Sequence, residues 1–322
     1  MFTPQDEEIH PVGSDTHWQE SWYFNWAASD GRSFGLSRIG YRFNQRQMDG
    51  LVLTLRDGKP EFIYPAVNLP LRGDVSNMSN IRASSGLKTG GLTYRMVEPF
   101  RKWKLELAGR NPMELTWEAF TPAYDYHSGG AELPPNVAGH HFEQAGRVTG
   151  WTRFRGREKQ VNGRGERDKS WGVRDWAKVE GWNWISAQFG DDLTFNVWEG
   201  FFGGRPYVNG FVFRDGENSG VERLSVRFHW GEREHIPART ELDFGTHDGS
   251  SYRVTVSTLA RFPLVKNGLW LEELHSSFTL IRNGGAERMG VGIIEHAWHA
   301  GMLKSLRYSG ELLKAAGQLI LP

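Results

Sequence analysis

Hydrophobic and polar residues alternate along much of this chain. A period of two places successive side chains on opposite faces of an extended backbone, so each alternating run predicts a half-buried β-strand. In the run 102–108, for example, Trp103, Leu105 and Leu107 fall on one face and charged residues on the other. The clearest alternating runs are residues 34–41, 102–108, 113–119, 182–188, 252–257 and 288–295.

Short turn signals separate these runs. Asp-Gly pairs stand at residues 57–58, 215–216 and 248–249, and a Gly-rich turn stands at 282–285. Such pairs favour tight hairpins, and a strand about every 10 residues is the spacing of a sandwich or barrel. We therefore predict an all-β protein of antiparallel barrel or sandwich units, with few short helices. The best helix candidate is residues 309–317.

A loop-rich stretch near the middle of the chain suggests how it is divided. Residues 121–135 are rich in Gly, Pro and Tyr, which suits an interdomain linker or a cover over a cavity. We place the boundary at residue 150. The chain is then predicted to hold an N-terminal β domain, residues 1–150, and a C-terminal β domain, residues 151–322.

Composition narrows the functional classes. The 322 residues contain 38 Lys and Arg against 38 Asp and Glu, so the net charge is zero. A neutral chain is a poor nucleic-acid binder, because such proteins need a basic surface to displace counterions. No apolar run approaches the ~18 residues of a membrane span, and the polar start resembles no signal peptide. We expect no nucleic acid partner, no stable membrane insertion and a cytoplasmic location.

Aromatic residues are abundant, whereas cysteine is absent. There are 14 Trp, 19 Phe and 9 Tyr, together with 39 Gly and no Cys. The lack of Cys excludes disulfides, thiolate catalysis and Cys-bound metals. The aromatic residues either fill large β cores or line a cavity for a flat, apolar ligand.

The most informative segment is 163–176, which we expect to form a charged loop. It holds the pairs Arg167-Asp168 and Arg174-Asp175 around Trp171. In one interpretation, Arg–carboxylate pairs join two sheets and the tryptophans anchor the packing. In the other, an Asp faces a cavity and moves protons, with the neighbouring Arg setting its pKa.

Two other segments combine Trp with polar groups. On a strand at 17–26, Glu20 shares a face with three tryptophans, and Tyr23 lies on the other face. Burial among indoles would raise the pKa of Glu20, as in a general acid, although it could equally be an edge residue paired with an Arg. On strands at 182–188 and 194–199, Trp182, Trp184 and Asn196 could line a pocket or a solvated face.

No metal site or nucleophile motif is expected. In the run 295–299, His296 and His299 would point to opposite faces of a strand, and the pair 140–141 has the same defect. Glu295 could serve as an acid or a hydrogen-bond acceptor. Serine-nucleophile and phosphate-binding loops are absent from the sequence.

Three stretches together resemble the AttH and carotenoid 1,2-hydratase (hydroxyneurosporene synthase) group. The strongest is residues 167–176 followed by Gly-Trp-Asn-Trp at 181–184, similar to the group's Asp-His-Ser/Asn-Trp-Gly motif. The others are residues 18–24 and the closing strand with Gly290, Gly292 and Glu295. The chain has Lys169 where the group usually has His, which puts any proton-carrying role of that position in doubt.

The resemblance implies two lipocalin-like halves (calycin-type β-barrels) around a cavity. It also implies a cofactor-independent hydratase, dehydratase, cyclase or isomerase for a hydrophobic isoprenoid-, steroid- or aryl-type substrate, since relatives include hydratases, cyclases and pericyclases. The alternative is a non-catalytic carrier or sensor of a lipid-like molecule, and exposed strand edges make a homodimer plausible. The candidate catalytic residues are Asp168, Lys169, Asp175 and Glu20. The candidate substrate-binding residues are Trp171, Arg174, Trp182, Trp184, Tyr23, Asn196, Glu295 and His296.

Overall fold

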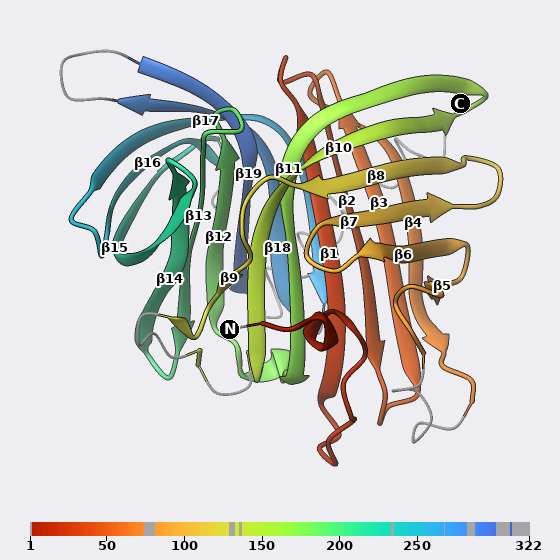
Figure 1. The fold of residues 1–322 in the computed structure, drawn as a ribbon. Helices are drawn as coiled ribbons and strands as arrows, with labels where there is room; N and C mark the ends of the chain where they lie inside the picture. Colours follow the sequence, from red (N-terminus) through yellow and green to blue (C-terminus); the bar gives the residue numbers. More distant parts are fainter. Residues whose placement is uncertain are drawn as a thin grey trace.

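A computed structural model shows two antiparallel β-sheets packed side by side (Figure 1). It describes residues 2–73, 81–128, 133–134, 137–232, 235–266, 268–281, 287–300 and 310. Apart from Gly310, the helix expected at 309–317 lies outside the described residues, as does the turn at 282–285. Within the described part of the chain, no helix is long and apolar enough to cross a bilayer.

The first sheet is 11-stranded and strongly curled. Its order is β4-β3-β2-β1-β11-β10-β8-β7-β6-β5, with β9 paired to β10, and β5 comes back to contact β2 and β3. The strands are β1 (Trp18–Ala28), β2 (Ser33–Arg42), β3 (Gln47–Arg56), β4 (Lys59–Pro70), β5 (Leu87–Thr89), β6 (Leu92–Glu98), β7 (Lys102–Leu107), β8 (Met113–Ala119), β9 (Tyr124–Asp125), β10 (His140–Phe154) and β11 (Arg157–Val173).

The second sheet is a closed barrel in which each strand pairs with the next and the last with the first. Closure removes exposed sheet edges. The strands are β12 (Gly181–Gln188), β13 (Leu193–Phe202), β14 (Arg205–Arg214), β15 (Glu217–Trp230), β16 (Pro237–Thr246), β17 (Ser251–Lys266), β18 (Leu269–Ile281) and β19 (Glu287–His299). The described helices are the 3₁₀ turns η1 (Pro4–Glu7) and η4 (Trp176–Lys178). The all-β prediction with two barrel-shaped units is therefore confirmed.

The alternating pattern located the strands well. The run predicted at 113–119 coincides with β8, and Trp103, Leu105 and Leu107 are buried together on β7 as predicted. The Asp57-Gly58 turn joins β3 to β4 with both residues at positive φ, 49° and 79°. Such a turn matches the twist of the strands that it connects.

The segment 163–176 is not a loop, so that prediction is wrong. Most of it is the second half of β11, and only its last residues turn into η4. Its glycines and paired charges suggested a loop, but this half of β11 is buried on both faces, and Arg167 and Lys169 have hydrogen-bond partners inside the protein. The change from one sheet to the other lies between Val173 and Gly181, whereas the predicted division of the chain fell at residue 150.

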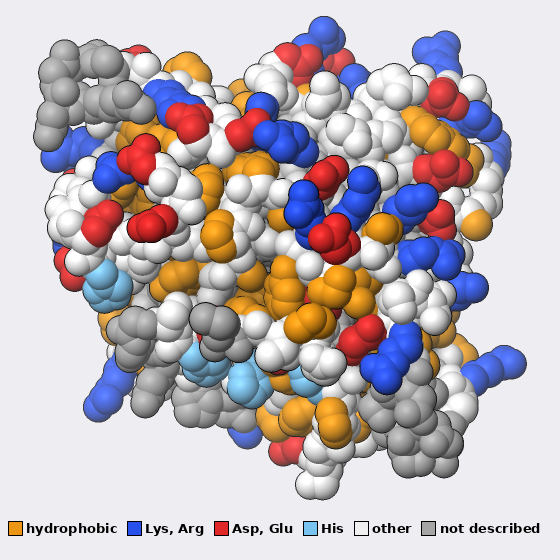
Figure 2. Space-filling model, in the orientation of Figure 1, with side chains coloured by type: hydrophobic (Ala, Val, Ile, Leu, Met, Phe, Trp, Pro, Cys, Tyr) orange, Lys and Arg blue, Asp and Glu red, His pale blue; other side chains and the backbone are white. Residues whose placement is uncertain are grey.

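Three apolar cores follow from this arrangement. One fills the curled first sheet, one fills the barrel, and the third lies between the two sheets. The third core draws on β1, β2, β3, β12, β13, β18 and β19, so it brings strands from both ends of the chain together. Figure 2 shows side chains of both charge signs interspersed over one face of the molecule, with apolar groups between them.

The N-terminal segment anchors β11 from inside the first sheet. Arg167 donates to both carboxylate oxygens of Glu7, at 2.9 and 2.5 Å, and to Gln144 Oε1. Lys169 donates to the backbone carbonyl oxygens of Asp6, at 2.6 Å, and Glu8. Residues 6–8 therefore hold the face of β11 that points away from the barrel.

A buried histidine between the sheets predicts an acid-sensitive interface. His275 on β18 is only 2% exposed and stacks on Phe34 of β2, with ring centroids 5.1 Å apart. Burial lowers the pKa of His275 to about 4, with a small opposing effect from Asp30. The unfolded chain, with a His pKa near ~6.5, takes up this proton first, so stability falls as the pH drops from ~6.5 to 4.

The variant His275→Phe should lose this part of the pH dependence. Its free energy of unfolding relative to the wild type is expected to rise by up to about 3 kcal/mol between pH 7 and pH 4. Urea unfolding at several pH values measures it. Parallel curves for the two proteins would contradict the prediction.

Candidate active site

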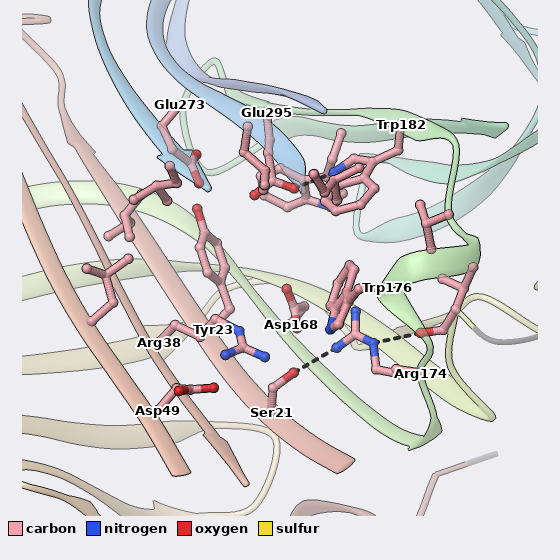
Figure 3. A pocket seen from close by; sticks show the side chains of 18 of the residues that line it. Ser21, Tyr23, Arg38, Asp49, Asp168, Arg174, Trp176, Trp182, Glu273 and Glu295 are labelled. Carbon is pink, nitrogen blue, oxygen red and sulfur yellow. Dashed lines mark hydrogen bonds between the residues drawn. The ribbon is translucent and has the colours of Figure 1, made fainter. Parts of the chain in front are cut away.

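The main cavity lies between the two sheets and has a volume of about 500 Å³. Its walls are largely apolar and rich in indoles, and its ionisable groups lie on two facing walls (Figure 3). The aromatic residues of the wall are Tyr23, Tyr126, Trp176, Trp182, Trp184, Trp198 and Phe202, and its ionisable residues include Arg38, Arg42, Asp49, His141, Asp168, Arg174, Glu273 and Glu295.

Strand register builds the wall on the first sheet. Glu143 on β10 is opposite Asp168 on β11, Asp168 is opposite Tyr23 on β1, and Tyr23 is opposite Arg38 on β2. Residues directly opposite one another in antiparallel strands share a face. Four strands therefore present a single polar row toward the barrel.

A second row on the barrel faces the first. Glu273 on β18 is opposite Glu295 on β19, and Glu295 is opposite Trp184 on β12. The rows meet where Trp184 Nε1 donates to Glu143 Oε1 at 2.7 Å and where Tyr23 packs edge-on against Trp184. The cavity is thus fixed by regular strand pairing in both sheets.

Asp168 projects into the cavity without a fixed partner. Its side chain lies between Tyr23 and Trp176 in Figure 3, and no hydrogen bond or ion pair to it occurs among the described residues. Burial raises the pKa of Asp168, while His141, Arg174 and Arg38 oppose this effect. A carboxyl that holds its proton more tightly than usual and faces a cavity can act as a proton donor or acceptor.

Glu273 and Glu295 form a carboxyl pair on the opposite wall. Their side chains are hydrogen bonded to each other, and Trp182 Nε1 also donates to Glu295. Burial raises the pKa of both groups, and proximity to Glu295 raises the pKa of Glu273 further. Because two adjacent carboxylates repel, the pair holds a proton more tightly than either group would alone, and Glu273 holds it most tightly. The hydroxyl of Tyr23 points toward Glu273 in Figure 3.

A fourth carboxyl group, that of Glu143, is fully buried behind Trp184 and His141 of the wall. Glu143 accepts hydrogen bonds from Trp184 and from His141 Nε2, the latter at 2.8 Å, and His141 Nδ1 lies 2.6 Å from Ser170 Oγ. Burial lowers the pKa of His141 to about 4, so its imidazole is neutral at pH 7. Burial raises the pKa of Glu143, and Asp168 raises it further.

Of the predicted site residues, Asp168, Arg174, Trp182, Trp184, Tyr23 and Glu295 line this cavity. Lys169, Glu20 and Trp171 do not. Lys169 and Glu20 face the interior of the first sheet, where their charged atoms lie 3.6 Å apart, and Trp171 stacks on His10 and contacts Lys169. Arg167 lies on that side too. Alternation along β11 sends its odd and even residues to opposite interiors.

Three further candidates also lie away from the cavity wall. Asp175 caps η4 by accepting from the backbone N–H of Ala177. Asn196 lies behind the wall and accepts a hydrogen bond from the Tyr126 hydroxyl. His296 faces the barrel interior, where its Nδ1 is 2.6 Å from Asn183 Oδ1.

Sequence reasoning missed Arg38, His141, Glu143, Glu273 and Trp176. A signal existed for Arg38, which continues the apolar face of Phe34 and Leu36 on β2. A charged residue on the buried face of a strand points to a polar cavity. Among the described residues, no group of three or more His, Asp or Glu side chains is arranged to hold a metal ion.

Solved structures share this two-sheet fold. A Nitrosomonas europaea protein assigned as AttH has 13% identity and a TM-score of 0.67, over 93% of this chain and 97% of that one. Kievitone hydratase from Nectria haematococca has 12% identity and a TM-score of 0.64, over 92% and 93%. CghA with Sch210972 has 15% identity and a TM-score of 0.67, over 93% and 96%.

The resemblance seen in the sequence predicted this fold, and the likeness to these structures confirms it. No curated protein matches the chain in sequence. One family model does match, over residues 3–300, which is nearly the whole described fold. The chain therefore belongs to the family described as a domain of unknown function, DUF7064.

Proposed function

We propose that this protein is a cofactor-independent lyase or isomerase that moves protons on a hydrophobic substrate bound between its two sheets. The observation that carries the proposal is Asp168, an unpaired carboxyl of raised pKa in a largely apolar cavity. The name of one protein of the same fold, kievitone hydratase, supports the reaction class. The structure of another, CghA with Sch210972, supports the binding of a small molecule by this fold.

The site suits chemistry through a cationic intermediate. The Asp168 carboxyl donates its proton to one carbon of a double bond, and the positive charge develops on the neighbouring carbon. Indoles such as Trp176, Trp182 and Trp184 stabilise a nearby cation by about 2 kcal/mol or more in a dry site. Water then adds to the cation and returns a proton to the Asp168 carboxylate, so that one water is added and the enzyme is unchanged.

Other outcomes use the same groups. The reverse sequence eliminates water. Attack by a second double bond in place of water closes a ring and leaves a new cation, which then loses a proton to the Asp168 carboxylate to give a neutral isomer. The pair Glu273 and Glu295 holds a further proton on the opposite wall, where it can serve the second face of the substrate. Trp182 orients Glu295 for this role.

Incubation with small-molecule extracts tests the proposal. Untargeted mass spectrometry should reveal a substrate that disappears and a product that differs from it by one water or is its isomer. Reaction in deuterated water should place one deuterium on carbon. A molecule that binds stoichiometrically but is recovered unchanged would identify a carrier and contradict the proposed reaction.

A further inference from the structure

Two guanidinium groups face the cavity, and no carboxylate of the described residues lies within ion-pair distance of either. Arg174 donates from Nε to the backbone carbonyl of Val137 at 2.6 Å and from Nη1 to Ser21 Oγ at 3.0 Å, and it lies over the ring of Trp176. Its Nη2 has no partner in the described chain. Arg38 makes neither a hydrogen bond nor an ion pair there.

A neighbouring arginine shows what a paired group in this wall looks like. Arg42, also on β2, forms an ion pair with Asp49 at 3.1 Å and bonds to Asn68 at 2.5 Å. Arg38 and Arg174 have no such neutralising partners, and their like charges repel. Burial, and then the charge of Arg38, lower the pKa of Arg174 to about 10, so Arg174 remains cationic at pH 7.

We infer that the substrate of this cavity is an apolar carboxylic acid, whose carboxylate is bound by Arg38 and Arg174. A guanidinium presents parallel N–H donors that match the two oxygens of a carboxylate, and a partly buried cation is strongly stabilised by such a partner. The inference rests on the proposed function in taking this cavity as the substrate site.

The same geometry orients the substrate. Tyr23 separates Arg38 from Asp168 along the polar row of the first sheet. With its carboxylate at the arginines, the apolar part of the ligand extends over Tyr23 toward Trp182, and passes Asp168 on the way (Figure 3). The arginines thus select the substrate and place its reactive carbon.

Binding of a fluorescent acid and its neutral ester tests this inference. The probes are cis-parinaric acid and its methyl ester, which differ only in the charge of the head group. The wild type should bind the acid more tightly. Arg38→Met should weaken binding of the acid about tenfold or more and change binding of the ester about twofold or less.

Further variants keep the test decisive. Arg38→Gln makes the same comparison with a polar side chain in case the Met variant folds poorly. Arg32→Met removes an exposed charge away from the cavity that Asp57 already neutralises, so it should weaken binding of the acid about twofold or less. Equal affinity of the wild type for acid and ester, or an equal loss of both in Arg38→Met, would overturn the inference.

The result is separable from the proposed function. Asp168→Asn should still prefer the acid over the ester, because the arginines remain. If it keeps this preference together with full turnover, the catalytic proposal fails and the substrate class stands. If the wild type shows no preference for the acid but its turnover depends on Asp168, the substrate class fails and the catalytic proposal stands.

Discussion

Turnover should fall about 10²- to 10⁴-fold when Asp168 is replaced by Asn, because the amide has the shape of the carboxyl but cannot transfer its proton. Binding should survive, since Asp168 makes no hydrogen bond that holds the wall in place. The measurement is the rate of product formation by mass spectrometry, together with the affinity for the parinaric probes.

The pH dependence provides a second measure of the same residue. If Asp168 acts as the acid, kcat/KM of the wild type falls as the pH rises through its raised pKa, because the proton is lost. Stability follows the same sign: the native state binds this proton more tightly than the unfolded chain, so Asp168 destabilises the fold as the pH rises above ~4. In Asp168→Asn both effects should disappear.

Asp175 provides a matched control from the same motif. Asp175→Asn makes the same chemical change seven residues away on a group that caps η4 and pairs with the exposed Lys178. Asn is also a good helix cap, and exposed ion pairs contribute little. This variant should keep near wild-type turnover. Wild-type rates in Asp168→Asn would rule out Asp168 as the acid.

The strands of this fold could be predicted from the sequence. Which interior each face of a strand points into could not. Glu20 and Asp168 both looked like buried acids, yet Glu20 points into the first sheet and Asp168 into the cavity. Both faces of β1 and β11 are covered, one by the core of the first sheet and one by the barrel. The alternation of side chains assigns residues to the two faces of such a strand, but it does not indicate which part of the protein packs on each face.

The missed residues had a different cause. Arg38, Glu143 and Glu273 lie far apart in the sequence. The registers of the two sheets bring Arg38 and Glu273 to the cavity wall and place Glu143 behind it, bonded to Trp184. None of these three residues belongs to the conspicuous Trp-rich motifs. Glu273 follows Glu272 in a largely buried strand, and alternation sends one to the cavity and the other to the barrel interior. Two adjacent acidic residues in a strand that is buried on both faces therefore indicate polar surroundings on each face.

A large loss of stability is expected on the other face of β11. Arg167 and Glu7 are both fully buried and share two hydrogen bonds, and Glu7 also accepts from the backbone N–H of Phe100 at 2.7 Å. Glu7→Ala leaves the Arg167 guanidinium buried, with Gln144 as its one remaining hydrogen-bond partner among the described residues. It should lower the free energy of unfolding by about 3–5 kcal/mol and the Tm by roughly 10 °C.

The double variant Glu7→Met, Arg167→Met isolates the cause. It replaces the pair by apolar side chains of similar size, which is often neutral or stabilising, so it should recover most of the loss. Denaturant unfolding of the two variants makes the comparison. If the double variant is as unstable as Glu7→Ala, packing of the N-terminal segment matters and the stranded charge does not.

This anchoring also explains why Lys169 is buried away from the cavity, and it links the stability of the fold to the position of Asp168. Arg167 and Lys169 flank Asp168 on β11 and bind residues 6–8, so the N-terminal segment fixes the strand on the side opposite the cavity. Lys169 acts there through backbone carbonyls, away from the substrate wall. In Glu7→Ala, folded protein at low temperature should therefore show a larger loss in kcat than in probe affinity, because the position of Asp168 depends on that anchor and the apolar walls do not.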